Sequence, residues 1–211
     1  MKGLFLLLTL ILSTINGKSQ ESWTYFPEDC LFLIDHDISE EAQQLIKKLA
    51  KLNKITRGDT GECSDQEACL KPYKDIVSGF DNLYSDSTLI EIVKQDYCPI
   101  VSCYAFSVLV CKADSIISEQ EILELALPFA EQNNSFVTLD WGCGWNDIET
   151  FDYIISLISG KFLWQTNFLP NLRAFSSSTV NQLLAAREPY YQGKDSYKQD
   201  KSWEEYKTSF F

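Results

Sequence analysis

Residues 105–111 read Ala-Phe-Ser-Val-Leu-Val-Cys, an apolar run that a single serine interrupts. A continuous run of this length, without alternation between apolar and polar residues, is typical of a strand buried on both faces. Such strands occur in parallel sheets, because helices cover both faces of those sheets. We therefore predict a central strand over residues 105–111.

Helices and strands are expected to alternate downstream of this strand. Ser118-Glu-Gln-Glu121 is a capping-box pattern, so a helix should begin there. Pro128 should kink or divide this helix, because proline removes a backbone donor. Further strands are predicted over residues 135–141, 172–175 and 189–192, and further helices over 147–158 and 202–210. Two crossover helices imply parallel strands and hence an α/β fold with a central sheet.

The residues upstream of the strand predict a second, smaller region that is mainly helical. Helices are predicted over residues 39–54 and through Phe80, a short strand over 30–34, and a loop over 56–66. A strand over 89–93 is predicted at the start of the α/β domain. We place the boundary so that residues 18–86 form a cysteine-containing helical region. Residues 87–211 then form the α/β domain.

The first seventeen residues have the pattern of a secretory signal peptide. Lys2 precedes an apolar run over residues 4–12, and small residues follow this run. Cleavage of the signal peptide is expected after Gly17. This run is too short to span a bilayer, and no later stretch is long and apolar enough, so no membrane span is predicted. We expect the protein in the lumen of the endoplasmic reticulum or outside the cell.

The charge balance of the 211 residues excludes one class of partner. The formal net charge is −12, and the sequence shows no cluster of Lys and Arg, so nucleic acid is not expected as a partner. Acidity favours solubility and at most a weak, diffuse binding of calcium. The single histidine, His36, does not combine with a cysteine in a usual zinc-site spacing, so no metal site or cofactor is predicted.

Seven cysteines in an oxidising compartment should mostly be paired, and an odd number leaves one thiol reduced or bonded to a partner. Cys30, Cys63 and Cys69 are disulfide candidates of the N-terminal region, which could be a stapled interaction domain without an enzymatic role. No pair has the Cys-x-x-Cys spacing of a dithiol redox centre. Asn133 begins an Asn-Asn-Ser glycosylation sequon.

Four segments carry a resemblance to a known family. They are Ser107–Ala113, Phe136–Asp140, Leu169-Pro170-Asn171-Leu172 and Tyr190-Tyr-Gln-Gly193. In this order they resemble the thioredoxin-like domains of the protein disulfide isomerase family, over about half the chain. The resemblance implies a thioredoxin-like central sheet flanked by helices, with Pro170 in the place of the family's cis-proline.

The chain departs from that family at the redox site. Active members carry Cys-x-x-Cys at a helix start, and this chain has Ser115 and Ser118 in that place. Hydroxyl groups form no disulfide, so dithiol exchange is excluded there. The resemblance then implies a redox-inactive member that binds polypeptide clients or a partner protein, with both serines capping a helix.

A second resemblance competes with the first. Val93-Lys-Gln95-Asp-Tyr-Cys98 and Ser102-Cys103-Tyr-Ala-Phe-Ser107 are similar to the nucleophile segment of papain-like cysteine proteases. This similarity implies Cys103 as the nucleophile, Gln95 as the oxyanion-hole donor and a Cys98–Cys143 disulfide.

That chemistry lacks its base, because the family's histidine follows the cysteine and no histidine follows His36 here. Two residues are also inserted between Cys98 and Cys103, and the glycine of the signature is missing. The alternative is therefore a truncated or inactive peptidase homologue, and we expect binding in preference to catalysis.

Overall fold

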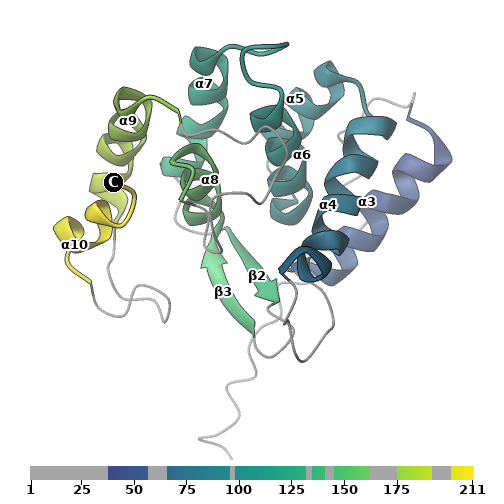
Figure 1. The fold of residues 1–211 in the computed structure, drawn as a ribbon, viewed down its shortest axis with the longest axis horizontal. Helices are drawn as coiled ribbons and strands as arrows, with labels where there is room; N and C mark the ends of the chain where they lie inside the picture. The colour runs from purple at the N-terminus through teal and green to yellow at the C-terminus, as the bar shows by residue number, and fades with distance from the viewer. Residues whose placement is uncertain are drawn as a thin grey trace, which may run out of the picture.

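The computed structural model describes residues 38–56, 66–95, 98–131, 135–140, 145–161, 175–191 and 201–211. In chain order these residues form α3 (Glu40–Leu52), β1 (Lys54–Thr56), α4 (Gln66–Leu83), α5 (Asp86–Gln95), α6 (Pro99–Cys111), α7 (Glu119–Ala130), β2 (Phe136–Asp140), β3 (Trp145–Glu149), α8 (Thr150–Ile158), α9 (Ser177–Arg187), the 3-10 turn η1 (Glu188–Tyr190) and α10 (Trp203–Thr208). Figure 1 shows these elements.

The predicted thioredoxin-like central sheet is wrong. The described elements are mostly helices, and their strands form one small sheet in the order β1-β2-β3. Strand β1 pairs with β2 in parallel, with Ile55 beside Leu139, and β2 pairs with β3 in antiparallel, with Val137 beside Ile148. The fold is therefore a helical assembly with a short mixed sheet.

The predicted central strand over residues 105–111 lies in helix α6. Pro99 occupies the first turn of this helix, where its missing N–H costs nothing, and every residue from Pro99 to Val110 is buried. A helix buried on all sides shows no amphipathic period, so a continuous apolar run does not separate it from a buried strand. The error arose because an apolar run indicates burial and leaves the type of element open.

Three other predicted elements also differ from the structure. Residues 89–93 lie in α5, where Leu89, Ile92 and Val93 are buried at helical spacing. The predicted strand over 189–192 begins in the turn η1, and the predicted helix over 147–158 begins as β3 and becomes helical only at Thr150. The strand predicted at 30–34 and residues 172–174 of the strand predicted at 172–175 lie outside the described residues, and Phe175 is not part of a strand.

The helix starts predicted at Ser39, Ser118 and Ser202 are confirmed, whereas α9 (Ser177–Arg187), which Ser176 caps, is not among the predicted elements. Ser39 caps α3, and Ser118 and Ser202 form complete capping boxes at α7 and α10. Strand β2 lies where a strand was predicted. Pro128 lies inside α7, which continues to Ala130.

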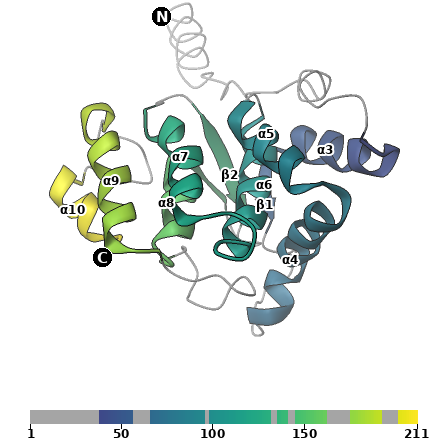
Figure 2. The ribbon, with the colours of Figure 1, turned by 90° about the horizontal axis from the view of Figure 1, so that it is seen from above.

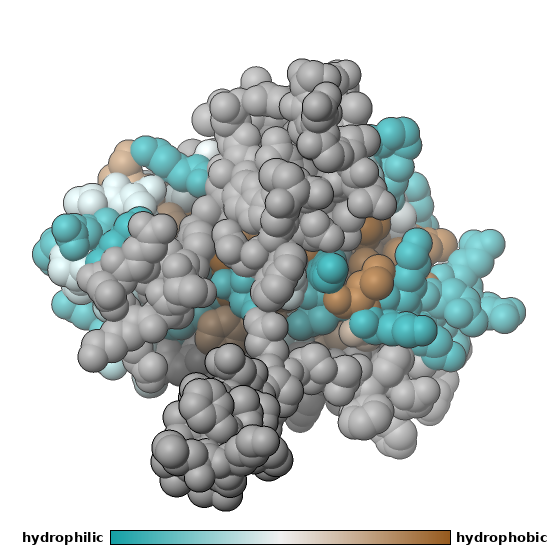
Figure 3. Space-filling view, turned by 90° about the horizontal axis from the view of Figure 1, so that it is seen from below, coloured by the Kyte–Doolittle hydropathy of each residue, from teal (hydrophilic) through white to brown (hydrophobic). Residues whose placement is uncertain are grey.

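Helix α6 occupies the middle of the molecule. It packs against α3, α4, α5, α8 and β2, while α7, α8 and α9 pack together on its other side (Figures 1 and 2). The inward face of the sheet contributes Val137, Leu139 and Ile148 to the same core. On the face drawn in Figure 3, hydrophilic side chains predominate on both flanks and a smaller hydrophobic area lies between them. None of the helices in the described ranges has the length and apolar character needed to cross a membrane.

Candidate functional site

The candidate nucleophile Cys103 lies inside the protein. It is the fifth residue of α6, and 0% of its surface is exposed. The field of a helix falls off within the first turn, which here ends before Cys103. The thiol is therefore placed as a core side chain, away from solvent and from the end of the helix.

A cluster of three hydroxyl groups lies beside Cys103, and we name it the central hydroxyl cluster. It consists of Tyr73 on α4, Ser107 on α6 and Tyr153 on α8, all of which are fully buried. The Tyr73 hydroxyl donates to Ser107 Oγ at 2.8 Å, and Ser107 Oγ donates to the Cys103 carbonyl oxygen at 2.8 Å. The Tyr153 hydroxyl lies 2.5 Å from that of Tyr73 and 2.8 Å from Ser107 Oγ.

These hydroxyl groups are neutral hydrogen-bonding groups. Burial raises the pKa of Tyr73 and of Tyr153 well above its usual value. Because the protons of Tyr73 and Ser107 are both used, Tyr153 donates to one of these two oxygens. The cluster ties α4, α6 and α8 together and presents no group to solvent.

Two other residues of the protease-like segment lie next to the start of α6. Gln95 ends α5 and is partly exposed, whereas Cys98 is the N-cap residue of α6 and is buried. Cys143 and His36 lie outside the described residues. No histidine occurs in the described ranges, since His36 is the only one in the chain. The described part of the chain thus supplies no imidazole near Cys103.

Ser115 and Ser118 lie in the connection between α6 and α7. Ser118 accepts from the Glu121 N–H at 3.2 Å and caps α7, as the sequence predicts. Ser115 Oγ donates to the Lys112 carbonyl oxygen at 2.7 Å and so closes the turn that ends α6. Both hydroxyl groups serve local backbone structure, and they follow a helix where the thioredoxin resemblance implies a strand.

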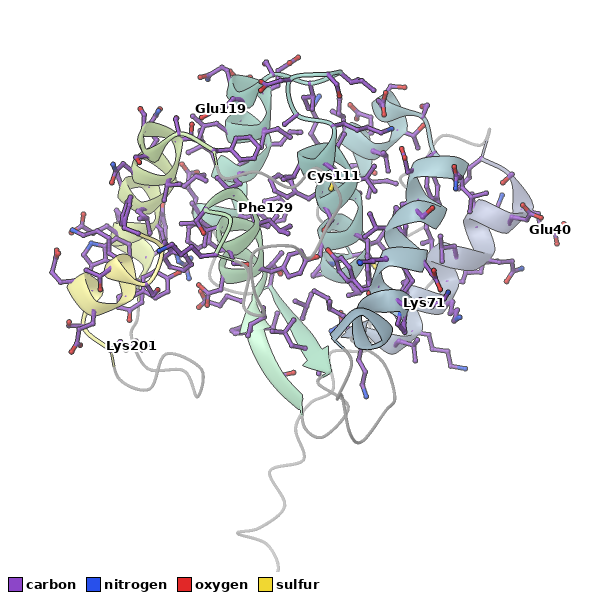
Figure 4. All side chains as sticks on the ribbon, in the orientation of Figure 1. Glu40, Lys71, Cys111, Glu119, Phe129 and Lys201 are labelled. Carbon is purple, nitrogen blue, oxygen red and sulfur yellow. The ribbon has the colours of Figure 1, made fainter. Side chains whose placement is uncertain are left out.

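Cys111 lies at the far end of α6 from Cys98 (Figure 4). It is half-buried and is not bonded to another cysteine. Burial, and then the nearby carboxylate of Asp81, raise the pKa of this thiol to about 12. Such a thiol is almost entirely protonated at neutral pH and is a poor nucleophile.

A second buried cluster, the C-terminal charged cluster, lies where α8, α9 and α10 meet. Arg187 is fully buried, forms an ion pair with Glu149 and donates to the Ala130 carbonyl oxygen at 3.3 Å. Its guanidinium carbon lies 5.3 Å from the centre of the Phe151 ring. Close by, the Tyr206 hydroxyl donates to Asp152 Oδ1.

Sequence reasoning missed both buried clusters. Their members are 34 to 80 residues apart for the central cluster, and 38 and 54 residues apart for the two pairs of the charged cluster. A local signal did exist at Asp152, a charged residue on the apolar face of α8. The sequence pattern did not identify its partner, Tyr206.

The remaining predicted site residues lie outside the described residues, except Cys69, whose side chain is not described. Cys30, Cys63, Cys143, Asn133 and Pro170 fall in the ranges left out, and Cys69 lies in α4. Within the described ranges, no group of three or more His, Cys, Asp or Glu side chains is placed to hold a metal ion.

Comparisons of the chain with known proteins give no match. Neither a protein-family model nor a curated protein nor a solved structure matches it.

Proposed function

We propose that this protein works in the secretory pathway, either in the lumen of the endoplasmic reticulum or outside the cell, by binding another polypeptide and without catalysis. The complete burial of Cys103 is the observation that carries the exclusion of cysteine catalysis. A cysteine nucleophile must reach a substrate and a base. The Cys103 thiol is fully buried inside α6, where a polypeptide substrate does not reach it.

The other polar groups of the interior support a structural role for the core. The central hydroxyl cluster is bonded within itself and to the Cys103 carbonyl, and Arg187 is paired with Glu149. Groups bonded to one another in this way hold helices together inside the protein. We therefore assign the binding of a partner to the surface.

The surface charge favours a basic polypeptide as the partner. A net charge of −12 attracts positively charged chains over long distances and speeds their encounter. The same field would attract calcium ions weakly and diffusely, and it opposes the binding of nucleic acid.

Light scattering of unfolding clients tests this proposal. Reduced lysozyme serves as a basic client, and reduced α-lactalbumin serves as an acidic client of similar size. We expect the protein to slow the aggregation of lysozyme more than that of α-lactalbumin, with both clients left uncleaved and the effect lost in molar salt. Failure to slow either aggregation, or cleavage of either client, would refute the proposal.

Cys103→Ala is the matched control for this assay. It removes the thiol while leaving a small apolar side chain in the core. We expect the variant, once shown to be folded by circular dichroism, to slow lysozyme aggregation as the unaltered protein does. A selective loss of this effect would assign a role to the thiol and contradict the proposal.

The second candidate function is that of a truncated or inactive homologue of the papain-like peptidases, and the helical state of the resembling segment favours it. The segment that resembles their nucleophile region forms a helix, α6, in the structure. This candidate shares the expectation that Cys103 does not react. A peptidyl epoxide that modified Cys103 in the folded protein would instead indicate an active site.

A further inference from the structure

Residues 201–211, which we name the C-terminal strap, contact the rest of the protein through one face. Trp203 and Tyr206 lie on α10 at positions i and i+3, and Phe210 lies in the turn that follows this helix. Tyr206 is 2% exposed and Phe210 is 9% exposed. The strap therefore contacts the body of the protein through aromatic side chains of α10 and of the turn that follows it.

The residues that receive the strap, which we name its seat, are Asp152, Lys161 and Tyr191, and Arg187 acts on Tyr206 electrostatically. Asp152 accepts the hydrogen bond of the Tyr206 hydroxyl, and Lys161 Nζ donates to the Phe211 carbonyl oxygen. The Tyr191 hydroxyl donates to the Lys201 carbonyl oxygen at 2.7 Å. These contacts hold the strap at its two ends and in its middle.

Aromatic rings complete the contact between strap and seat. The ring of Tyr191 lies 4.7 Å from that of Tyr206 and 5.1 Å from that of Trp203, measured between centroids. Within the strap, Phe210 meets the Tyr206 ring edge-on at 5.2 Å. Such ring pairs add stabilisation to the area that they bury.

The surroundings of Tyr206 keep its hydroxyl group protonated, so that it donates a hydrogen bond to Asp152 of the seat. Burial, and then the Asp152 carboxylate, raise the pKa of Tyr206 well above its usual value, so this hydroxyl remains a donor. Arg187 and Glu149 also act on it electrostatically. A phenylalanine in this place would leave a buried carboxylate without that donor.

The strap depends on the seat, whereas the seat is formed by other contacts. Helix α10 has six residues, and an isolated helix of that length is not stable in water. Helices α7, α8 and α9 pack against one another, and Arg187 is held by Glu149 and the Ala130 carbonyl. In Figures 1 and 2, α10 lies at the edge of the molecule, beyond α9.

We propose that the C-terminal strap is exchangeable and that its seat accepts the same segment of a second copy of the chain. The strap's own residues are the evidence that this sequence fits the seat. Reciprocal exchange reproduces every contact and yields a symmetric dimer. The exchange is independent of which polypeptide the protein binds elsewhere on its surface.

Binding of a fluorescent synthetic peptide of residues 201–211 to the full chain tests the seat. The probe is added to the unaltered protein and to Tyr206→Ala, whose own strap is weakened. We expect fluorescence anisotropy to show binding to Tyr206→Ala that is at least about tenfold tighter, because the unaltered strap competes with the peptide. Glu204→Gln, on the exposed face of α10, is the control and should bind as the unaltered protein does.

A second variant keeps the test decisive if Tyr206→Ala does not fold. Tyr206→Phe retains the ring and removes only the donor to Asp152, and circular dichroism checks its fold. Tighter peptide binding to this variant than to the unaltered protein supports the proposal. Equal binding to both, or no binding to any folded variant, overturns it.

Energy transfer between two differently labelled populations of the unaltered chain tests the second copy as occupant. Incubation at high concentration should produce a signal that excess unlabelled 201–211 peptide abolishes. No signal after prolonged incubation would overturn the exchange and leave the strap as an intramolecular contact only.

Discussion

The two buried polar clusters both join secondary-structure elements inside the protein, but they do so through different chemical groups. The central hydroxyl cluster joins α4, α6 and α8 through three neutral groups. The C-terminal charged cluster joins β3, α8, α9 and α10 and includes two carboxylates and one guanidinium. Both are buried, and Glu149 keeps 7% of its surface exposed.

This difference predicts how each cluster responds to change. Neutral hydroxyl groups lose little on burial when they are bonded to one another, and the raised tyrosine pKa values keep them neutral. A charge removed from water is costly unless its partner remains. The side near the C-terminus should therefore be the more sensitive to single substitutions, although it lies further from the centre.

Arg187→Met should produce the largest loss of stability. The substitution leaves the buried Glu149 carboxylate without its cation, and we expect a loss of about 3–5 kcal/mol in the free energy of unfolding. Urea denaturation measures this loss. The double variant Arg187→Met/Glu149→Leu is the control and should recover most of it, since it removes the unpaired charge as well. A single variant as stable as the unaltered protein would show that the pair does not bear on folding.

Tyr153→Phe should produce a smaller loss, because it leaves neutral groups behind. We expect about 1–3 kcal/mol in urea denaturation, from buried oxygens that lose one partner. Tyr190→Phe, at an exposed position on η1, is the control and should change the stability by less than about 0.5 kcal/mol. If Tyr153→Phe costs more than Arg187→Met, the ranking of the two clusters is wrong.

Glu119→Gln tests a third polar contact, at the surface between α7 and α9. Glu119, at the start of α7 (Figure 4), accepts hydrogen bonds from the Ser176 and Thr179 hydroxyl groups and from the Ser176 N–H, and these bonds lower its pKa. A carboxylate with a lowered pKa stabilises the fold above its ordinary value of 4.5, and this contribution disappears as the pH falls through the lowered value.

The variant should therefore be less stable than the unaltered protein at neutral pH, by about 0.5–1 kcal/mol, and equal to it in strong acid. Thermal unfolding across a pH series measures the difference. Glu124→Gln, also on α7, serves as the control. A difference for Glu119→Gln that grows in acid would contradict the assigned sign.

The last prediction concerns the reactivity of the Cys111 thiol and no change in stability. A pKa of about 12, against an ordinary value of 9.0, lowers the thiolate fraction at neutral pH about a thousandfold. We expect iodoacetamide to modify Cys111 far more slowly in the folded protein than in guanidinium, as followed by mass spectrometry. Equal rates would show that the thiol is not shielded.

The starts of α7 and α10 could be predicted from the sequence, because a capping serine and its glutamate lie three residues apart. Ser118 and Glu121 give this signal, and so does Ser202 with Glu205. Helix α6 gives no such signal. Its cap is Cys98, whose side chain makes no capping hydrogen bond, and its uniform burial removes the period that distinguishes a helix from a strand.

The candidate site could be located along the chain, but its burial could not be predicted. The residues that enclose Cys103 and Ser107 come from α4 and α8, and Tyr73 and Tyr153 are separated from Ser107 by 34 and 46 residues. A short motif such as Ser102-Cys103-Tyr-Ala-Phe-Ser107 describes neighbours in sequence. Whether a cysteine reaches solvent depends on neighbours in space.

Modification of Cys103 in the folded protein is the most direct test of the central claim that this thiol is a core group. The native protein is treated with a peptidyl epoxide and with iodoacetamide at mildly acidic and at neutral pH, and the labelled cysteines are mapped by mass spectrometry. We predict that Cys103 stays unmodified by either reagent until guanidinium unfolds the protein. Stoichiometric modification of Cys103 by the epoxide under native conditions would contradict the account.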